Sequence, residues 1–528
     1  MTQNVQDEDA RIESLELAAA GYKQAMPRRF SFWSLAALAF DLTCTWLGVG
    51  SSIGIGLTEA SAAGILWTII VAGCMSTCTL ASVLTQYYWS FMVASEEYKP
   101  FTSFFNGWIS IIGWWLGAAS VANFISAMIL EIVLVWHPEF QIQHWQQYLI
   151  YVGITWIAVV INIFASRYIP LFNKLIFVLA ILTLTGTMLA LFIISRNTHA
   201  PTDWVFGDTT NRTGWPSDGF AFMLAVSNAV YSFLGSDCGA HLCEEIPNPA
   251  KNVPRVILYP LLVGMLTAFP FAVSLLYAIT DVEAVFSSPA GLPLIEIYHQ
   301  GTHSRVAASV LLALFAFCFF GNLVANGTTC SRTLWAVSRD GTLPYSHLWM
   351  TVSEKFEMPL NAILLSGTFI TLWGLIFIGS TTAFSAMVSA AIIFQQTSCV
   401  IPQAIVLFRG RDKVLPPRHF NLGRLGPIIN ATAVAWVIFL DVLYCFPVAL
   451  PVTAQNMSYV SVVSTGLVLF VVALWFTTKR NVFKGPKVDY ELMNERRLAA
   501  IGGETIGVIV DAKTEVVHHR GKRASDEE

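Results

Sequence analysis

Charged residues are scarce in this chain of 528 residues. Asp, Glu, Lys and Arg make up 12% of it, whereas a soluble protein carries about a quarter. The apolar residues instead form blocks of roughly 20, the length that a helix needs to cross the hydrocarbon of a bilayer. Short alternating strands of the kind that build a membrane β-barrel are missing. The composition therefore predicts an all-α polytopic membrane protein.

Several functional motifs are also missing. No lysine follows a glycine-rich loop in the pattern of an ATP-binding loop, and no basic stripe indicates nucleic acid. No nucleophile–base set appears, and the Cys238, His241 and Cys243 spacing is too compact for the usual zinc sites. The nine cysteines fall mostly in apolar blocks, which predicts buried free thiols. We therefore expect no enzyme activity, no cofactor and no metal.

Twelve apolar segments are long enough to cross a membrane. They are expected at 33–57, 62–83, 104–136, 147–166, 170–195, 218–240, 255–280, 306–331, 359–379, 382–408, 427–447 and 458–478. These spans define a transmembrane domain at 33–478 between two polar tails, 1–32 and 479–528.

Basic residues predict the orientation of the chain. They concentrate on the side that both tails share, for example in the cluster at 409–424, and are few on the other side. Lys and Arg favour the cytoplasmic side, so both termini are predicted to be cytoplasmic. The expected membrane is the plasma membrane. Two N-x-S/T sequons, at Asn211 and Asn456, fall on the predicted outer side and are candidate glycosylation sites.

The first and sixth spans contain helix-weakening glycines. The first has four of them between positions 48 and 56, and the sixth has Gly235 and Gly239 on either side of Asp237. The two spans lie five apart, so related helices there would run in opposite directions. This offset predicts a 5+5 inverted-repeat core with broken helices 1 and 6, the arrangement in which transporters bind substrate. Alternatively, the glycines only allow helices to pack closely.

A substrate site between the two breaks would have two poles. If the first span unwinds at its glycines, its free N–H groups suit a carboxylate, whereas Asp237 suits an ammonium group or the coupling proton. The alternative for Asp237 is a permanent structural hydrogen bond. The candidate substrate-binding residues are Gly48, Gly50, Ser51, Ser52, Gly54, Phe233, Gly235, Ser236 and Asp237.

An acidic loop follows the sixth span, and a basic loop follows the eighth. Pairing between them would form a cytoplasmic gate, although solvated loop charges are the alternative. The candidate gate residues are His241, Glu244, Glu245, Arg332 and Arg339.

Four motifs in this order resemble the fungal amino-acid/choline permease branch, which includes GABA and choline permeases, of the amino acid–polyamine–organocation superfamily. They are R-F-S-F-W-S at 29–34, G-S-D-x-x-x-H-L-C-E-E-I-P-N-P at 235–249, the S-R…R-D-G-x-L-P loop at 331–344, and the P-R…G-P segment at 417–427. The resemblance is weakest at 79–100, where the turn that usually follows the second span is shortened.

The resemblance implies twelve helices and import by alternating access, often coupled to protons. The leading hypothesis is a secondary active transporter for a small amine-bearing solute, either an amino acid or GABA, or a choline-like amine. Its expected partners are that solute, protons and the lipid bilayer. The alternative hypothesis is a nutrient sensor that binds the solute on the same scaffold without transporting it.

Overall fold

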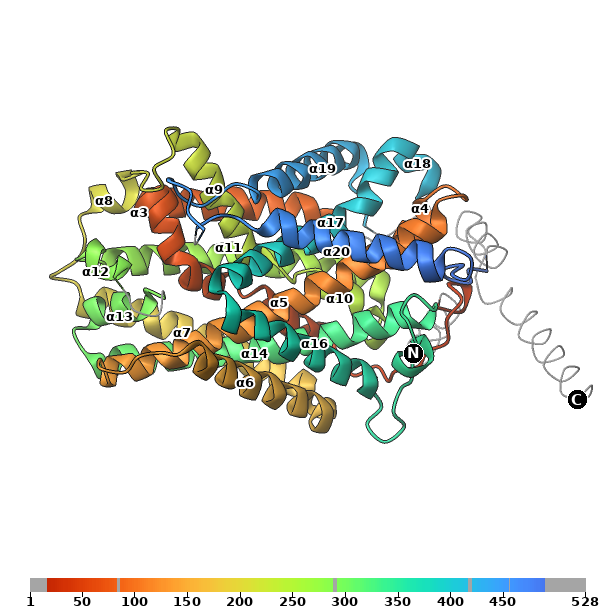
Figure 1. Cartoon of the computed structure of the whole chain (residues 1–528), viewed down its shortest axis with the longest axis horizontal. Helices are drawn as coiled ribbons and strands as arrows, with labels where there is room; N and C mark the ends of the chain where they lie inside the picture. The colour runs from red at the N-terminus through yellow and green to blue at the C-terminus, as the bar shows by residue number, and fades with distance from the viewer. Residues whose placement is uncertain (1–16, 83–85, 288–291, 416–419, 455, 490–528) are drawn as a thin grey trace, which may run out of the picture. The chain divides into compact units, whose positions relative to one another are not determined.

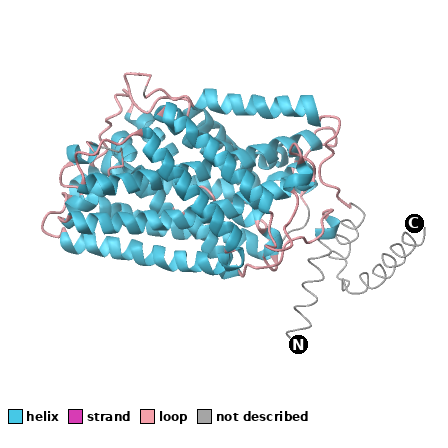
Figure 2. Cartoon of the chain, turned by 60° about the horizontal axis from the view of Figure 1, so that its bottom comes forward, coloured by secondary structure: helices cyan, strands magenta, loops and turns pink. Residues whose placement is uncertain are grey.

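The structure, a computed structural model, describes residues 17–82, 86–287, 292–415, 420–454 and 456–489. Apart from one isolated bridge between Ser353 and Met358, this part of the chain contains helices and loops only (Figure 2). The contacts divide the chain into two units. The larger, 26–414 with 420–485, contains all the membrane-crossing helices of the described residues. The smaller, 1–25 with 415–419 and 486–528, falls mostly outside the described residues, as do most of the two predicted tails.

Eleven described segments are long and apolar enough to cross a membrane. The first of them has 50 residues and contains two crossings, because the chain leaves the helical conformation at Ser61, with φ 52° and ψ −164°. The prediction of twelve spans is therefore confirmed.

The crossings are α2 (Phe32–Thr43) with the first part of α3 (Thr45–Ala81), the rest of α3, α5 (Lys99–Trp136), α6 (His144–Phe164), α7 (Ile169–Ile194), α9 (Asp218–Val230) with α10 (Cys238–His241), α11 (Pro249–Ala278), α14 (Arg305–Arg339), α16 (Leu360–Gly379), α17 (Thr381–Arg409), α19 (Gly426–Leu443) and α20 (Val460–Leu474). Short helices lie in the connections: α4 (Gln86–Val93), α8 (Thr202–Gly207), α12 (Val282–Phe286), α13 (Leu294–Thr302), α15 (Ser346–Trp349) and α18 (Arg411–Val414). In Figure 1, α8, α12 and α13 lie at one end of the larger unit, and α4 and α18 lie at the other.

The long helices are apolar on all sides, as helices surrounded by lipid and protein must be. In α7, for example, Leu175 and Leu182 are exposed, whereas Ala180, Leu184 and Leu191 are buried against neighbouring helices. The exposed leucines give α7 an apolar outer face, as expected for a helix that crosses a membrane. Packing therefore decides which face of each helix turns inward.

Both predicted breaks are present, five crossings apart. The first span stops at Cys44, a left-handed residue with φ 32° that separates α2 from α3. The sixth span leaves α9 through a 3₁₀ turn at Tyr231–Phe233, becomes extended at Leu234 and passes Gly235 with φ 79° before α10 begins. Gly235 thus supplies the positive φ that ordinary side chains disfavour.

The expected position of the first break was wrong. Residues 48–54 are helical and belong to α3, so the chain does not unwind at its glycines. These glycines allow close packing instead: a Cβ added at Gly48 would lie 2.5 Å from the Ser232 Oγ, and one at Gly50 would lie 2.8 Å from the Phe315 ring. The alternative reading of this stretch, close helix packing, is therefore correct.

Helix packing has the reciprocity of an inverted repeat. The third crossing, α5, packs against the eighth and the tenth, α14 and α17. The eighth crossing packs in turn against the third and the fifth, α5 and α7. These contacts are unchanged when each crossing is replaced by the one five positions away, as expected for a 5+5 core.

Side chains from the tenth crossing and from α18 contact described residues at both ends of the shortened connection after the second crossing. The Gln403 Nε2 donates to the Thr79 carbonyl at 2.6 Å, and the Arg411 Nη1 donates to the Ser82 Oγ at 3.2 Å. The Arg409 Nη1 donates to the Val93 carbonyl at 2.8 Å, at the end of α4. Carbonyls at these helix ends thereby gain the donors that the helices no longer supply.

Replacing Gly48 by alanine is expected to destabilise the protein. The new Cβ would lie 2.7 Å from the Cα of Ser232, which is backbone, so α3 and the 3₁₀ turn of the sixth span would have to separate. Such overpacking costs about 1–3 kcal/mol. We expect a lower melting temperature for the purified protein in detergent.

Gly186→Ala in α7 is the matched control, because a Cβ there meets no atom within 4 Å. Its melting temperature should stay the same or rise slightly, since alanine favours a helix over glycine. Equal melting temperatures for wild type and Gly48→Ala would contradict the close approach at this glycine.

Candidate functional site

A cavity lies where the two breaks meet. About 450 Å³ there is not occupied by protein atoms, a volume that includes space open to solvent. The residues that line it are Leu42, Thr43, Cys44, Leu47, Gly48, Trp114, Gly117, Ser120, Val121, Tyr231, Leu234, Gly235, Phe319, Asn322, Asn326 and Gln395. Both broken spans therefore contribute, together with α5, α14 and α17.

Side chains hold the two breaks together. The Thr43 Oγ1 lies 2.8 Å from the Ser236 Oγ, which links the first break to the sixth span. The Asn322 Nδ2 in α14 donates to the carbonyls of Asp41 and Leu42, at 2.8 and 2.7 Å. These carbonyls belong to the last turn of α2, whose acceptors lack helical partners. The carbonyls of Asp41 and Leu42 at the first break therefore have hydrogen-bond donors, and the break is ordered.

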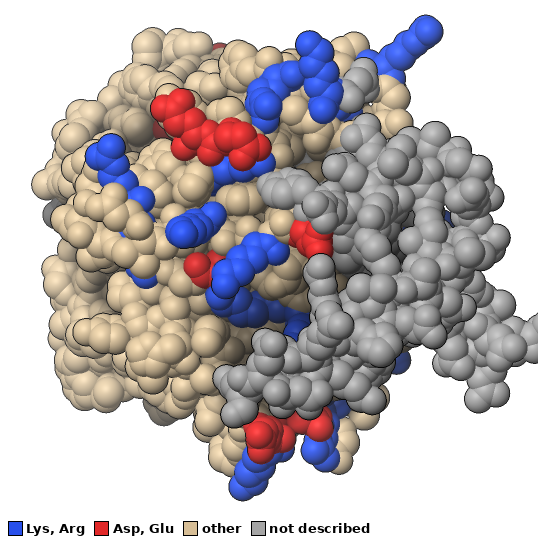
Figure 3. All heavy atoms as spheres, turned by 90° about the vertical axis from the view of Figure 1, so that its right-hand side faces the viewer, with Lys and Arg blue, Asp and Glu red and all other residues tan. Residues whose placement is uncertain are grey.

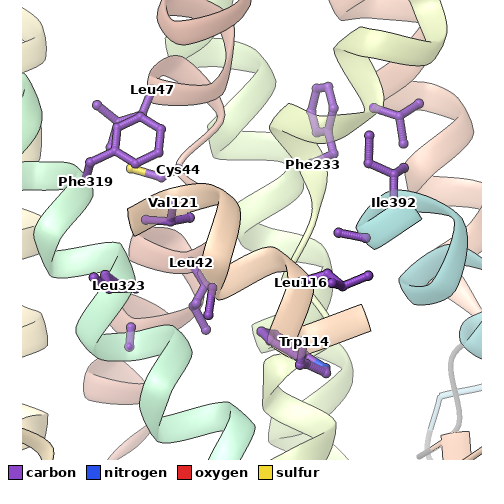
Figure 4. Packing of buried hydrophobic residues seen from close by; sticks show 14 of the residues in the cluster. Leu42, Cys44, Leu47, Trp114, Leu116, Val121, Phe233, Phe319, Leu323 and Ile392 are labelled. Carbon is purple, nitrogen blue, oxygen red and sulfur yellow. The ribbon is translucent and has the colours of Figure 1, made fainter. Parts of the chain in front are cut away.

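Aromatic rings form one part of the cavity wall. Trp114 of α5, Tyr231 of the sixth span and Phe319 of α14 all line it. Figure 4 shows Phe319 beside Cys44 and Leu47 of the first span. The Tyr231 hydroxyl lies 3.0 Å from the Ser120 Oγ, which fixes this ring against α5. Such rings present negatively polarised faces to a cation.

The polar part of the wall is made of amides and hydroxyls. Within the described chain, none of the sixteen lining residues is charged. The Gln395 Nε2 donates to the Gly113 carbonyl at 3.2 Å, so its Oε1 is the free acceptor, and the Asn322 Oδ1 is free in the same way. Both oxygens are buried without a described partner, which is costly unless a ligand supplies a donor.

Two of the predicted binding residues, Gly48 and Gly235, line the cavity. Gly54 faces the ring of Pro293, and a Cβ there would lie 2.7 Å from it. The hydroxyls of Ser51 and Ser52 both donate to the Gly48 carbonyl, at 2.9 and 2.8 Å. Gly54, Ser51 and Ser52 are thus absent from the lining, as is Gly50.

The other predicted residues of the sixth span, Phe233, Ser236 and Asp237, are absent from the cavity lining. Phe233 is fully buried, and its ring end lies near Gly73 in the second crossing. Ser236 is engaged with Thr43. The Asp237 Oδ2 lies 3.3 Å from the Nε2 of His241, one turn further along α10.

His241 connects Asp237 to the cavity wall. The Trp114 Nε1 donates to the His241 Nε2 at 3.2 Å. The indole and imidazole rings meet edge-on, with centroids 5.6 Å apart. His241 therefore belongs with Asp237 and Trp114, and not with the ion pairs that follow.

The other four predicted gate residues form two ion pairs. The Arg332 Nε lies 2.8 Å from the Glu245 Oε1, and both side chains are buried. Arg339 pairs with Glu244, and its guanidinium also lies 4.0 Å from the ring centroid of Trp335. Burial raises the pKa of Glu244 above its ordinary value, while Arg339 beside it acts in the opposite direction. The pairs join α14 to the loop after α10.

The two candidate glycosylation sites lie in folded loops. The Asn211 Nδ2 donates to the Trp215 carbonyl at 2.8 Å, and the Asn456 Nδ2 donates to the Pro451 carbonyl at 2.9 Å. Both side chains are half-buried. Their glycosylation stays a prediction.

Sequence reasoning missed most of the lining residues, among them Trp114, Tyr231 and Gln395. For Gln395 a signal was present, because Gln395 and Gln396 form a polar pair inside an apolar span. Trp114 and Tyr231 carried no such signal, since aromatic residues are common throughout the spans.

Twelve apolar crossings, two opposed broken helices and an uncharged cavity between them define a multi-pass membrane transport protein. Residues 30–472 match the sequence profile of the family described as amino acid permease, and the chain belongs to that family.

Its relatives include a choline transporter of Saccharomyces cerevisiae, 29% identical over 95% of this chain and 89% of the relative. Amino-acid permease BAT1 of Arabidopsis thaliana is 28% identical, over 89% of this chain and 96% of the relative. The 7-keto 8-aminopelargonic acid transporter of Saccharomyces cerevisiae is 27% identical, over 83% of this chain and 90% of the relative.

Replacing Glu245 by alanine is expected to lower the melting temperature strongly. The change leaves the Arg332 guanidinium buried without its carboxylate, and breaking a buried pair in this way costs about 3–5 kcal/mol. The double variant Glu245→Met/Arg332→Met should recover most of the loss, because it removes both charges.

Glu96→Ala removes the exposed carboxylate that pairs with the buried Lys99, 2.6 Å away, and serves as the control. It should shift the melting temperature less than Glu245→Ala, because a pair whose carboxylate is in contact with solvent contributes less than a fully buried pair. Equal shifts in melting temperature for Glu245→Ala and Glu96→Ala would contradict the burial of the Arg332–Glu245 pair.

Proposed function

We propose that this protein is a secondary active transporter that imports a small amine-bearing solute across the plasma membrane. The solute is an amino acid or GABA, or a choline-like amine, and it binds in the cavity between the two broken helices. The observation that carries the proposal is this cavity, which both breaks line together with aromatic and amide side chains.

The wall suits an amine for three reasons. Trp114, Tyr231 and Phe319 line the cavity, and aromatic rings attract cations. The free oxygens of Asn322 and Gln395 accept hydrogen bonds from ammonium or hydroxyl groups. The carbonyl end of α2 faces the same region and contributes the negative pole of a helix dipole. The relatives named above agree, since their names refer to choline, amino acids and an amino-substituted acid.

In this proposal the inner end of the molecule is the one that carries α4 and α18. Figure 3 views this end. Several Lys and Arg side chains are visible on the part of its surface that grey atoms do not cover. Arg409 and Arg411 lie there, at the end of α17 and the start of α18. Such an excess of positive charge favours the cytoplasmic side.

The two ion pairs of α14 would close the inner side. Glu245 also accepts a hydrogen bond through its carbonyl from the Phe30 backbone N–H, at 3.1 Å, just before the first span. The Arg332–Glu245 contact therefore lies where the first, sixth and eighth crossings come together. Opening of the cavity to the inside would require this junction to separate.

Proton coupling is proposed at Asp237. Its carboxyl group is buried beside the break of the sixth span and contacts His241 rather than the cavity itself. A carboxyl group inside a membrane is costly when ionised, so its protonation can be tied to a change of conformation. Asp237 is thus a proton-binding candidate rather than a direct substrate contact.

An uptake panel tests the proposed function. Cells that lack their own permeases would express the protein and receive radiolabelled amino acids, GABA, choline and polyamines, with and without a proton gradient. We expect accumulation of at least one amine, and a loss of accumulation when the gradient is collapsed. Binding without accumulation, in protein shown to reach the membrane, would instead support a nutrient sensor.

Gln395→Leu is expected to discriminate between amines. A hydrogen bond to a charged group contributes about 1.5–3 kcal/mol, so KM for a primary amine should rise roughly ten- to hundredfold. KM for choline should rise less, because its quaternary nitrogen has no N–H to donate.

Gln396→Leu is the matched control, because this neighbour is buried but does not line the cavity. It should leave the ratio of KM values for primary amines and choline unchanged. The same ratio in both variants would remove Gln395 from substrate recognition.

A further inference from the structure

Two different groups contact the same imidazole nitrogen. The Trp114 Nε1 lies 3.2 Å from the His241 Nε2, and the Asp237 Oδ2 lies 3.3 Å from it. All three side chains are buried, with the exposed fraction of His241 at 8% and that of Asp237 at 4%. Water therefore does not readily substitute for either contact.

The chemistry of these groups allows only one of the two hydrogen bonds at a time. An indole N–H can only donate, whereas an imidazole Nε2 either carries a proton or offers a lone pair. If the Nε2 offers a lone pair, it accepts from Trp114, and the Asp237 contact is attractive only when the carboxyl group carries a proton. If the Nε2 carries a proton, it donates to ionised Asp237, and the Trp114 N–H loses its acceptor.

We infer that Trp114 is the positioning residue through which the proton on the Asp237–His241 pair controls the shape of the substrate cavity. This inference rests on the proposed transport function and concerns how the two sites are linked. With Asp237 protonated, the indole is anchored to His241. When the Asp237 proton passes to the Nε2, and the Nδ1 proton then leaves to water, the carboxylate takes the Nε2–H bond and the indole is released.

Release of the indole alters the cavity because Trp114 is part of its wall. The ring lies in the same lining as Tyr231 and Phe319, so its displacement changes the surface that an amine would contact. A solute that packs on the anchored indole binds the protonated form more tightly. By linkage, it also strengthens proton binding by the same factor.

Other titratable and charged groups near the pair do not replace this connection. In α10, the Cys238 thiol interacts electrostatically with both Asp237 and Asp41 of α2. From α14, Arg332 is paired with Glu245. Arg339 is paired with Glu244 in the loop that follows α10. Among the contacts described, the indole N–H joins the pair to the cavity wall.

Trp114→Phe tests the link, because phenylalanine keeps an aromatic ring but has no N–H. The probe is a radiolabelled amine that the wild type accumulates, with KM measured from pH 5 to pH 7.5. Wild-type KM should rise with pH by a factor in the range of 5–150, the usual size of such coupling. In Trp114→Phe and in Asp237→Asn, KM should vary less than twofold across the same range.

Trp115→Phe is the matched control. Trp115 is the next residue of α5, and its Nε1 donates to the Ser366 Oγ at 2.9 Å, away from the cavity lining. This variant should keep the wild-type dependence of KM on pH. A Trp114→Phe profile that follows the wild type would overturn the inference, while uptake itself would stand.

A second measurement covers the case in which Trp114→Phe does not fold. Calorimetric titration of the purified wild type with the same amine, in buffers of different ionisation enthalpy, counts the protons taken up on binding. Proton uptake that accompanies binding to the wild type and disappears in Asp237→Asn is expected. No proton uptake at any pH would overturn the link, whereas a wild type that accumulates none of the panel would refute the proposed transport function instead.

Discussion

Every backbone N–H and C=O group inside a bilayer needs a partner within the protein, and this constraint governs the structure around the two breaks. Interrupting α2 at Cys44 leaves carbonyls at the end of a helix in the middle of the protein. The Asn322 amide supplies donors to two of them, and the hydroxyls of Thr43 and Ser236 join one break to the other. The cavity is the space that remains between the two breaks once these hydrogen bonds have formed. Its position is therefore tied to α14 as firmly as to the broken spans themselves.

The same constraint explains why part of the site could be predicted from sequence and part could not. Apolar blocks and an Asp between glycines can be recognised without a structure, because charge and glycine are costly in a membrane helix. The position of the first break could not be recognised in this way. A run of glycines is compatible with either an unwound segment or a close contact between helices. Here the glycines pack against Ser232 and Phe315, so they serve the close contact. Cys44 adopts a left-handed conformation that its residue type does not predict.

Long-range pairing set a second limit on prediction. Opposite charges in the loops after the sixth and eighth spans suggested a gate, and the structure brings Glu245 to Arg332 and Glu244 to Arg339. His241 was grouped with them because it is close in sequence, yet one turn of helix directs it to Trp114 instead. Sequence shows which groups can pair, but the helix rotation that chooses among partners comes from packing across α5 and α14.

The separation of charge from the cavity has a consequence for transport. Asp41, Glu59 and Asp237 are all buried carboxyl groups, yet none of them lines the cavity. An ionised carboxylate in direct contact with an ammonium group would bind it strongly at low dielectric, and a transporter must also release its solute on the other side. Amide oxygens and ring faces bind a cation more weakly, which permits release. A neutral cavity, however, cannot sense a proton by itself. Coupling then requires a group that touches both the cavity and a titratable pair, and Trp114 meets this requirement because its ring lines the cavity while its N–H reaches His241.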